Sequence, residues 1–352
     1  PSLQILNKSY MKKDHLSLLN NIQETGEELP TSERYMLIDG LNLFFRNFSA
    51  INAVNPNGAH IGGLGGFFRS LGALIRQIQP TQIYMVFDGI GSSTNRKNII
   101  PEYKSNRNVN RITNWDAFDN LEEEDQSKVD QITRIIQYLK TLPIKTITLG
   151  KVEADDVIAY LSKTLPKGPD DRSFIVSSDK DYLQLVDNNT VVYRPIEKKY
   201  YTEQTVKEIF NISPHNFLLY KLLMGDSSDG IKGIKGLGPK GLYKRFPELT
   251  KRDMSLDDLL DISENKLGEH IIYARVLHDI ELLENKYKVM DLSNPMIDDK
   301  DKMFIDKFVE NTPLNYLPSQ FIEMYNQDQL GGIIRNVDIW LKDNFKNLLE
   351  DK

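Results

Sequence analysis

Acidic residues follow three apolar segments of the chain at the points where those segments end. Asp39 comes directly after residues 35–38, Asp88 after residues 83–87, and Asp179 after residues 174–178. If these segments are parallel strands, their carboxyl ends share one edge of a sheet, which is where open sheets bind ligands. For any one of them, an ordinary turn such as Asp-Gly is the simpler interpretation. Three acids at one edge favour a site.

Further acids lie close to the ends of predicted elements. Glu153, Asp155 and Asp156 open a predicted helix, where the helix dipole alone would explain one or two of them. Asp181 lies two residues after Asp179. Asp226 and Asp229 form a separate pair further along the chain, and they are spaced to share one side of a turn.

Nine carboxylates that converge in this way would repel one another strongly unless cations lie between them. The sequence has no cysteine, and its five histidines are scattered, so the ligands would all be oxygens. Oxygen ligands favour Mg²⁺, or alternatively Mn²⁺, over Zn²⁺. Two such ions can hydrolyse a phosphodiester, and the adjacent cations Arg96 and Lys97 would contact the scissile phosphate.

A glycine-rich segment, GIKGLGPKG at residues 233–241, has the pattern of a helix-hairpin-helix. Its glycines allow a phosphate to approach backbone amides, and Lys232, Lys235 and Lys240 add affinity for a duplex backbone. A flexible loop with solvated lysines is the alternative, and the specificity of the pattern makes it the weaker one.

The chain has 352 residues, which is enough for one large or two ordinary domains. Its net charge is −6. That charge alone argues against a nucleic-acid binder, but its distribution does not. Residues 91–115 contain five cationic residues and one acid, and residues 231–245 contain five cations and no acid. The sequence shows neither a long apolar segment for a membrane span nor a secretory signal, so we expect a cytoplasmic protein.

The elements that would position these residues alternate between strand and helix. Strand patterns at residues 35–38, 83–87, 144–149 and 174–178 are separated by helical patterns, which predicts an α/β fold with a parallel, doubly wound sheet. From residue 202 onward the patterns are helical. We therefore expect a lead-in at 1–33, a catalytic domain at 34–201 and a helical domain at 202–352 that contains the hairpin at 225–246.

At these residues the sequence resembles the 5′ nuclease, or flap endonuclease, family. The matching segments occur in the family's order: LIDGLNLFFR (37–46), VFDG (86–89), RKNIIPEYKSNR (96–107), VEADDVIA (152–159), SSDKDYLQL (177–185) and GDSSDGIKGIKGLGPKG (225–241). The tail from residue 286 to 345 is more similar to the T-even phage ribonuclease H branch. The resemblance implies a PIN-like sheet with flanking helices and a helical arch at about residues 91–127.

The resemblance also implies roles for particular residues. One metal would lie near Asp39, Asp88, Glu153 and Asp155, and a second near Asp155, Asp179, Asp181 and Asp229, with Asp226 and Asp156 as outer support. Lys97 matches the active-site lysine, and Arg46 and Arg96 match phosphate contacts. Lys104 and Arg107 would bind DNA from the arch. The backbone at Gly233, Gly236 and Gly238 would hold K⁺ against the duplex.

The acidic segment at residues 121–125 departs from a basic arch, and its acids would form a solvated rim or repel misplaced strands. Trp115 and Phe118 would stack on bases or pack within the arch.

The expected function is therefore a metal-dependent 5′ nuclease that removes DNA flaps or RNA primers in replication or repair. We expect it to act as a monomer on branched or nicked duplexes, with a single-strand-binding protein and a sliding clamp as candidate partners. The alternatives are a PIN-like ribonuclease, which would not need the hairpin, and a catalytically silent binder of branched DNA, which would gain nothing from nine acids.

Overall fold

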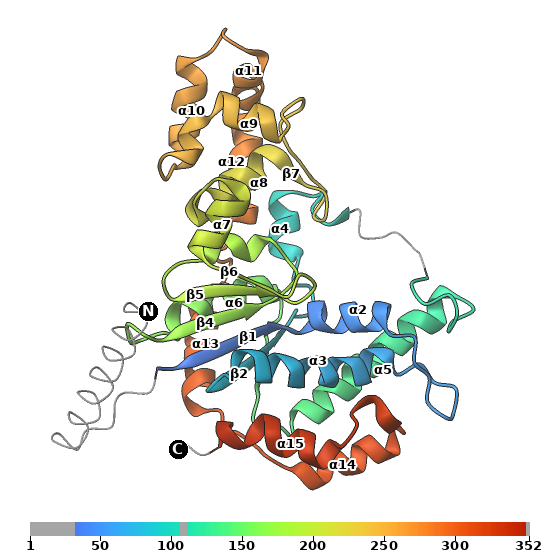
Figure 1. The fold of residues 1–352 in the computed structure, drawn as a ribbon. Helices are drawn as coiled ribbons and strands as arrows, with labels where there is room; N and C mark the ends of the chain where they lie inside the picture. The colour runs from blue at the N-terminus through green and yellow to red at the C-terminus, as the bar shows by residue number, and fades with distance from the viewer. Residues whose placement is uncertain (1–31, 106–111, 350–352) are drawn as a thin grey trace, which may run out of the picture.

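A central six-stranded sheet organises the protein (Figure 1). The computed structural model describes residues 32–105 and 112–349. The strand order is β3-β2-β1-β4-β5-β6, and the pairs are parallel except for β6, which runs antiparallel to β5. The strands are β1 (Arg34–Asp39), β2 (Gln82–Phe87), β3 (Lys145–Thr148), β4 (Arg172–Val176), β5 (Thr190–Arg194) and β6 (Lys199–Tyr201). The expected parallel α/β sheet is confirmed.

Each face of the sheet is buried under its own hydrophobic core, because successive side chains of a strand point to opposite faces. On β1, Tyr35 and Leu37 face one core, whereas Met36 and Ile38 face the other. The first core includes α6 (Ala154–Thr164), and the second includes α2 (Gly40–Ala50) and α3 (Gly62–Ile78). A strand buried on both faces reads as a continuous apolar run, which is why β1 and β2 are visible in the sequence.

After β6, a group of helices extends beyond the β5–β6 side of the sheet (Figure 1). They are α7 (Glu203–Phe210), α8 (Phe217–Met224), α9 (Pro239–Arg245), α10 (Leu256–Asn265), α11 (Ile271–Leu277) and α12 (Ile280–Met290). A two-stranded ribbon of β7 (Gly225–Asp226) and β8 (Ile231–Lys232) lies between α8 and α9. This helix-ribbon-helix unit contains the glycine-rich hairpin.

The end of the chain, which lies within the expected helical domain at 202–352, packs back on elements of the sheet. α13 (Asp299–Asn311) precedes α14 (Pro318–Gln327) and α15 (Val337–Phe345), which pack on α3 beneath the sheet (Figure 1). Phe321, Trp340 and Phe345 belong to the same core as Met36 and Ile38. Residue 202 therefore marks where the strands end, but the last helices complete the sheet's own core.

Two local features differ from the sequence-based expectations. α5 (Leu121–Leu139) begins at the acidic segment, because the Asn120 side chain accepts a hydrogen bond from the Glu123 amide and caps the helix. The acids at 122–124 are thus its first turn, where the helix dipole favours negative charge. The strands β5 and β6 were not predicted, since their apolar runs are short.

The arch expected at 91–127 is described in part. It includes α4 (Thr94–Ile99) and the start of α5, while Arg107 and most of the expected lead-in lie outside the described residues. Among the helices that the structure describes, none is both long and apolar enough to cross a membrane.

Candidate metal centre and nucleic-acid interface

Four aspartates line a cavity of about 370 Å³ at the carboxyl edge of the sheet: Asp39, Asp88, Asp155 and Asp179. Asp39 ends β1, Asp88 follows β2, and Asp179 follows β4, the three strands at the centre of the sheet. The chain order reverses between β1 and β4, and such a switch point leaves a crevice at the strand ends. The topology therefore brings together acids that are up to 140 residues apart in the sequence.

Hydrogen bonds fix two of these carboxylates against helix starts. Asp39 caps α2 by accepting a hydrogen bond from the Asn42 amide at 2.9 Å, and it also accepts one from the Ser177 hydroxyl at 3.3 Å. Asp88 accepts a hydrogen bond from the Ala154 amide at 2.7 Å, at the first residue of α6. Each of these two acids therefore binds an amide at a helix start and still lines the cavity.

The other two carboxylates are oriented by the segment after β4. Asp155 accepts a hydrogen bond of 2.5 Å from the hydroxyl of Tyr182, which is completely buried. Asp179 accepts one from the Asp181 amide at 2.9 Å. Tyr182 is a positioning residue that the sequence analysis missed, because a buried tyrosine in an apolar run carries no distinguishing signal.

Ionisation of two of these aspartates, Asp39 and Asp155, is costly without a cation. Burial and then the charges of Asp88 and Asp179 raise the pKa of Asp39 to about 7, although hydrogen bonds from Asn42 and Ser177 oppose this. Burial and the charges of Asp179 and Asp39 likewise raise the pKa of Asp155 well above its ordinary value. A divalent cation would remove both penalties, so this all-oxygen donor set fits Mg²⁺ or Mn²⁺.

A second acidic group lies at the ribbon that precedes the hairpin. Single carboxylate oxygens of Asp181, Asp226 and Asp229 lie within 4.8 Å of one another, which is close enough to share a cation. The Lys221 ammonium forms ion pairs with Asp181 and, at 2.6 Å, with Asp226. Burial opposes ionisation of Asp226, but Lys221 and Ser228 hold its pKa below the usual value. Lys221 is a second residue that the sequence analysis missed.

Arg96 was expected to contact a phosphate, but it is buried and paired with two acids. Its guanidinium donates to both oxygens of Asp156, at 2.6 and 2.9 Å, and lies 3.3 Å from Glu153. Its Nε donates to the Val289 carbonyl at the end of α12. Arg96 and Asp156 are only 3% and 1% exposed, so the pair holds α4, α6 and α12 together and lies away from the cavity wall.

Lys104, and not Lys97, is the arch lysine that lines the carboxylate cavity. The Lys104 ammonium lies 2.8 Å from Glu153, and its backbone amide donates to the Asp229 carbonyl at 2.9 Å. The neighbouring Tyr103 hydroxyl donates to Glu153 at 3.1 Å. Lys97 is exposed on α4 outside the cavity wall. Arg46 on α2 also lines the cavity, as expected of a phosphate contact.

The hairpin brings the chain unusually close to itself. A Cβ at Gly233 would lie 2.3 Å from the Met224 carbonyl carbon and 2.5 Å from the Gly225 amide nitrogen, so only glycine fits there. Lys232, Lys235 and Lys240 are exposed around it, which suits contact with a duplex backbone. The carbonyls of Lys232 and Lys235 accept hydrogen bonds from Lys286 and Arg275.

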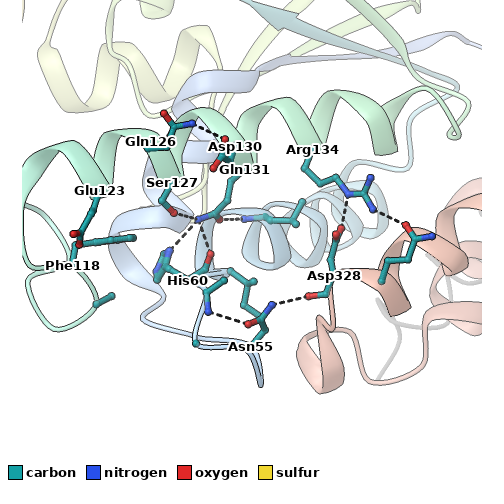
Figure 2. Close-up of a pocket in the computed structure, with 16 residues that line it drawn as sticks. Asn55, His60, Phe118, Glu123, Gln126, Ser127, Asp130, Gln131, Arg134 and Asp328 are labelled. Carbon is teal, nitrogen blue, oxygen red and sulfur yellow. Dashed lines mark hydrogen bonds and ion pairs between the residues drawn. The ribbon is translucent and has the colours of Figure 1, made fainter.

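A larger cavity of about 570 Å³ lies between α5, the loop after α2, and the end of α14 (Figure 2). Its central polar groups bond one another: the Gln131 amide nitrogen donates to the His60 carbonyl at 2.9 Å, and Arg134 donates to Asp328 at 2.7 Å. Phe118 at its rim stacks on Phe48, whereas Trp115 is 75% exposed. This cavity has fewer acids than the carboxylate cavity, and its acids do not lie at the ends of strands.

Comparisons with known proteins agree with this geometry. Residues 34–211 match the family model described as 5′-3′ exonuclease, N-terminal resolvase-like domain. A 5′-3′ exonuclease from Aquifex aeolicus is 34% identical over 86% of this chain and 94% of its own length. DNA polymerase I from Lactococcus lactis subsp. cremoris is 31% identical over 68% of this chain, and the chain spans only 27% of that protein.

Solved structures show the same fold. A flap endonuclease of bacteriophage T5, solved with DNA and metal ions, superposes with a TM-score of 0.59 at 21% identity, covering 90% of this chain and 99% of its own. Human GEN1, solved with Holliday junction DNA, gives 0.54 at 12% identity, covering 90% and 72%. Together with the family match over half of the sequence, these findings place the protein: the chain belongs to the 5′-3′ exonuclease family, with the PIN-like fold of 5′ nucleases.

Proposed function

We propose that this protein is a metal-dependent, structure-selective 5′ nuclease that hydrolyses phosphodiesters in DNA flaps or RNA primers during replication or repair. The observation that carries the proposal is the cavity in which four aspartates from three strand ends and one helix start meet Lys104 and Arg46. An acidic edge of this kind suits a cation and a phosphate together, because each compensates the charge of the other.

The aspartates of the cavity, Asp39, Asp88, Asp155 and Asp179, would hold one Mg²⁺ with Glu153 close by. Asp181 and Asp229 would contribute to a second, with Asp226 as outer support, while Asp156 would act only through Arg96, which contacts Glu153. When bound, such ions polarise the scissile phosphate and lower the pKa of water. Mn²⁺ would fit the same oxygens. Lys104 would meet the phosphate at this edge, and Arg46 would orient it from α2.

The hairpin would bind the duplex next to the cleavage site. Its exposed lysines supply contacts to the phosphate backbone that do not depend on sequence. We propose that K⁺ binds to the backbone of the turn at Gly233, Gly236 and Gly238, because residues without side chains let an ion approach the backbone closely. α4 and the start of α5 would admit the single-stranded 5′ end.

The proposal extends to the oligomeric state, the compartment and the partner proteins. We propose that the protein acts as a monomer in the cytoplasm on branched or nicked DNA, alongside a single-strand-binding protein and a sliding clamp.

The test uses three labelled substrates: a 5′ flap, a nicked duplex and an RNA-primed duplex, each with Mg²⁺ and with EDTA. We expect Mg²⁺-dependent cleavage near the junction, and the relative rates will rank flap against primer removal. Asp155→Asn should lower the cleavage rate by at least about 100-fold while leaving flap binding largely unchanged, because a cation ligand is lost. Asp299→Asn, with a fully exposed carboxylate on α13, is the matched control.

Other outcomes would select other functions. Tight binding to the flap without cleavage in Mg²⁺ or Mn²⁺ would indicate a silent binder. Cleavage of single-stranded RNA alone, without need of a duplex, would indicate a PIN-like ribonuclease. Full turnover by Asp155→Asn would contradict the assignment of the metal ligands.

A further inference from the structure

Two cationic side chains from outside the hairpin donate hydrogen bonds to its backbone. The Lys286 ammonium on α12 donates to the Lys232 carbonyl at 2.8 Å. The Arg275 guanidinium on α11 donates to the Lys235 carbonyl at 2.5 Å. These acceptors lie at the end of β8 and in the turn that follows it. Ordering a long cationic side chain costs rotamer freedom, so both contacts must stabilise something in return.

Gly236 makes room for the arginine in the turn. Its φ is +80°, in the left-handed region that glycine adopts most easily. A Cβ on Gly236 would lie 2.7 Å from Nη1 of Arg275. A side chain at this position would therefore displace the guanidinium from the Lys235 carbonyl. One glycine of the hairpin pattern thus serves a contact within the chain.

α11 also supports the far end of the hairpin. The Tyr273 hydroxyl donates to the Arg245 carbonyl at 2.9 Å, and the Tyr273 ring packs edge-on against Phe246 with 5.6 Å between the ring centroids. Arg245 ends α9, a helix of seven residues, and so short a helix is not stable in isolation. β7 and β8 have two residues each. The hairpin therefore depends on contacts from α11 and α12 for its shape.

Lys286 differs from the lysines of the hairpin itself. It is half-buried, and this burial lowers the pKa of its ammonium; Asp279 opposes the shift, and the charge of Lys232 adds to it. A lysine that serves only to attract phosphates gains from remaining solvated, as the exposed Lys235 and Lys240 are. Lys286 instead gives up solvation for a backbone carbonyl, which indicates a role in shape.

We propose that Arg275 and Lys286 are positioning residues for the duplex, because they hold the hairpin in its binding shape by placing their own cationic groups on its carbonyls. The inference rests on the proposed binding of a duplex by the hairpin. A shape that is held from within the chain does not require a bound ion, so duplex affinity should be about equal in Na⁺ and in K⁺. K⁺ at the glycines would add to this shape without being needed for it.

The experiment measures the affinity for a plain duplex by fluorescence anisotropy, over a series of NaCl concentrations and again in KCl. The double variant Arg275→Met with Lys286→Met should bind roughly tenfold more weakly in NaCl, the scale of a lost hydrogen bond from a charged group, and KCl should restore part of the loss. Its slope of log affinity against log salt should be unchanged, because neither side chain contacts a phosphate. Arg275→Lys with Lys286→Arg should bind nearly as the unaltered protein does.

Two further variants are matched controls for charge. Lys240 is exposed in the hairpin, so Lys240→Met should reduce the salt slope by about one, as expected of a phosphate contact. Lys288 is exposed on α12 two residues after Lys286, and Lys288→Met should leave the affinity unchanged.

Hydrogen exchange in the absence of DNA measures the shape directly. The amides of residues 231–245 should exchange faster in the double variant, while those of the sheet stay protected. The inference is overturned if these amides exchange at the same rate in both proteins, if the double variant lowers the salt slope by about two, or if the unaltered protein loses affinity when Na⁺ replaces K⁺. If the unaltered protein binds no duplex in either salt, the proposed duplex binding fails instead.

Discussion

At the scale of residues, Lys104 is the lysine of the expected arch that reaches the carboxylate cavity. Its ammonium lies 2.8 Å from Glu153 inside the carboxylate cavity, whereas Lys97 points to solvent from α4. A cation at this point would stabilise negative charge that develops on the phosphate, and removing such a group commonly costs on the order of 100-fold in rate.

We therefore expect Lys104→Ala to lower the single-turnover rate of flap cleavage by roughly 100-fold and Lys97→Ala to change it by only a few-fold. The two variants remove the same charge from neighbouring parts of the arch, so they control for each other. The reverse order of effects would show that Lys97 moves into the site when DNA binds. Duplex affinity, measured by fluorescence anisotropy, separates binding from the chemical step.

The raised pKa of Asp39 predicts how stability varies with pH when no divalent metal is present. Because burial and neighbouring charges raise this pKa from 3.8 to about 7, the folded state binds the proton more tightly than the unfolded state. Its stabilising effect is complete below 3.8 and is lost as the pH rises through about 7. Mg²⁺ should restore stability at high pH.

In EDTA, the Tm should fall by at least about 2 °C between about pH 5.5 and about pH 8. The decline should be smaller for Asp39→Asn, and Mg²⁺ should abolish most of it in the unaltered protein. Differential scanning fluorimetry measures all three. An Asp39→Asn profile that parallels the unaltered one would contradict the pKa argument.

The acids of the centre could be predicted from the sequence, but their partners could not. Asp39, Asp88 and Asp179 each follow an apolar run, and a parallel sheet necessarily brings such positions together. Arg96 and Lys104 are both cations in one basic segment. Their spacing does not indicate that Arg96 pairs with Asp156 or that Lys104 enters the cavity. Those positions depend on how the segment bends, including the left-handed conformation of Lys104.

At the scale of elements, the hairpin depends on the close approach of two backbone segments. Gly233 packs against the end of α8, where a Cβ would meet backbone atoms at 2.3 and 2.5 Å. Backbone atoms cannot move aside as a flexible side chain can, so even alanine must displace the ribbon. Gly238 has no heavy atom within 4 Å of its Cβ position and a negative φ of −108°.

Gly233→Ala should accordingly weaken binding to a plain duplex, while Gly238→Ala should leave it within about twofold. Both variants keep every lysine of the hairpin, so the comparison isolates its shape from its charge. Electrophoretic mobility shift at fixed salt provides the measurement. Equal binding by the two variants would mean that the ribbon adapts without loss.

Element types were predictable where the apolar pattern was long, and their limits were not. β1, β2 and α3 follow from continuous buried runs or helical spacing. The start of α5 was missed because residues 122–128 contain no apolar residue, although Asn120 and the acids after it supply a start signal. β5 and β6 were missed because a short antiparallel pair at the sheet edge needs few apolar residues.

At the scale of the whole molecule, the last helices support the catalytic sheet. Trp340 on α15 stacks with Phe321 and contacts Phe68 of α3 and Phe345, and it is 8% exposed. Replacing a buried tryptophan of this kind by alanine typically costs about 3–5 kcal/mol. The effect should reach the metal centre through the core that α3 shares with β1.

Trp340→Ala should therefore lower the free energy of unfolding by about 3–5 kcal/mol, whereas Trp115→Ala should change it by less than about 0.5 kcal/mol. The sequence has only these two tryptophans, so each variant also leaves one fluorophore with which to follow urea unfolding. Equal stability of the two variants would show that α15 is dispensable for the sheet.

The return of the chain to the sheet could not be predicted from the sequence. Its helical patterns after residue 202 fit equally well with a separate domain, and only long-range packing distinguishes the two arrangements.

This arrangement has a consequence for synthesis on the ribosome. The chain emerges from its amino end, and a domain folds as soon as its packing partners are available. β1, with Asp39, leaves the exit tunnel about 300 residues before α15, so the core that β1 shares with α2 and α3 lacks its last helices through most of translation. The hairpin is made before this core is closed. In nascent chains, the proposed duplex-binding element would therefore form before the sheet that holds the carboxylates is stable.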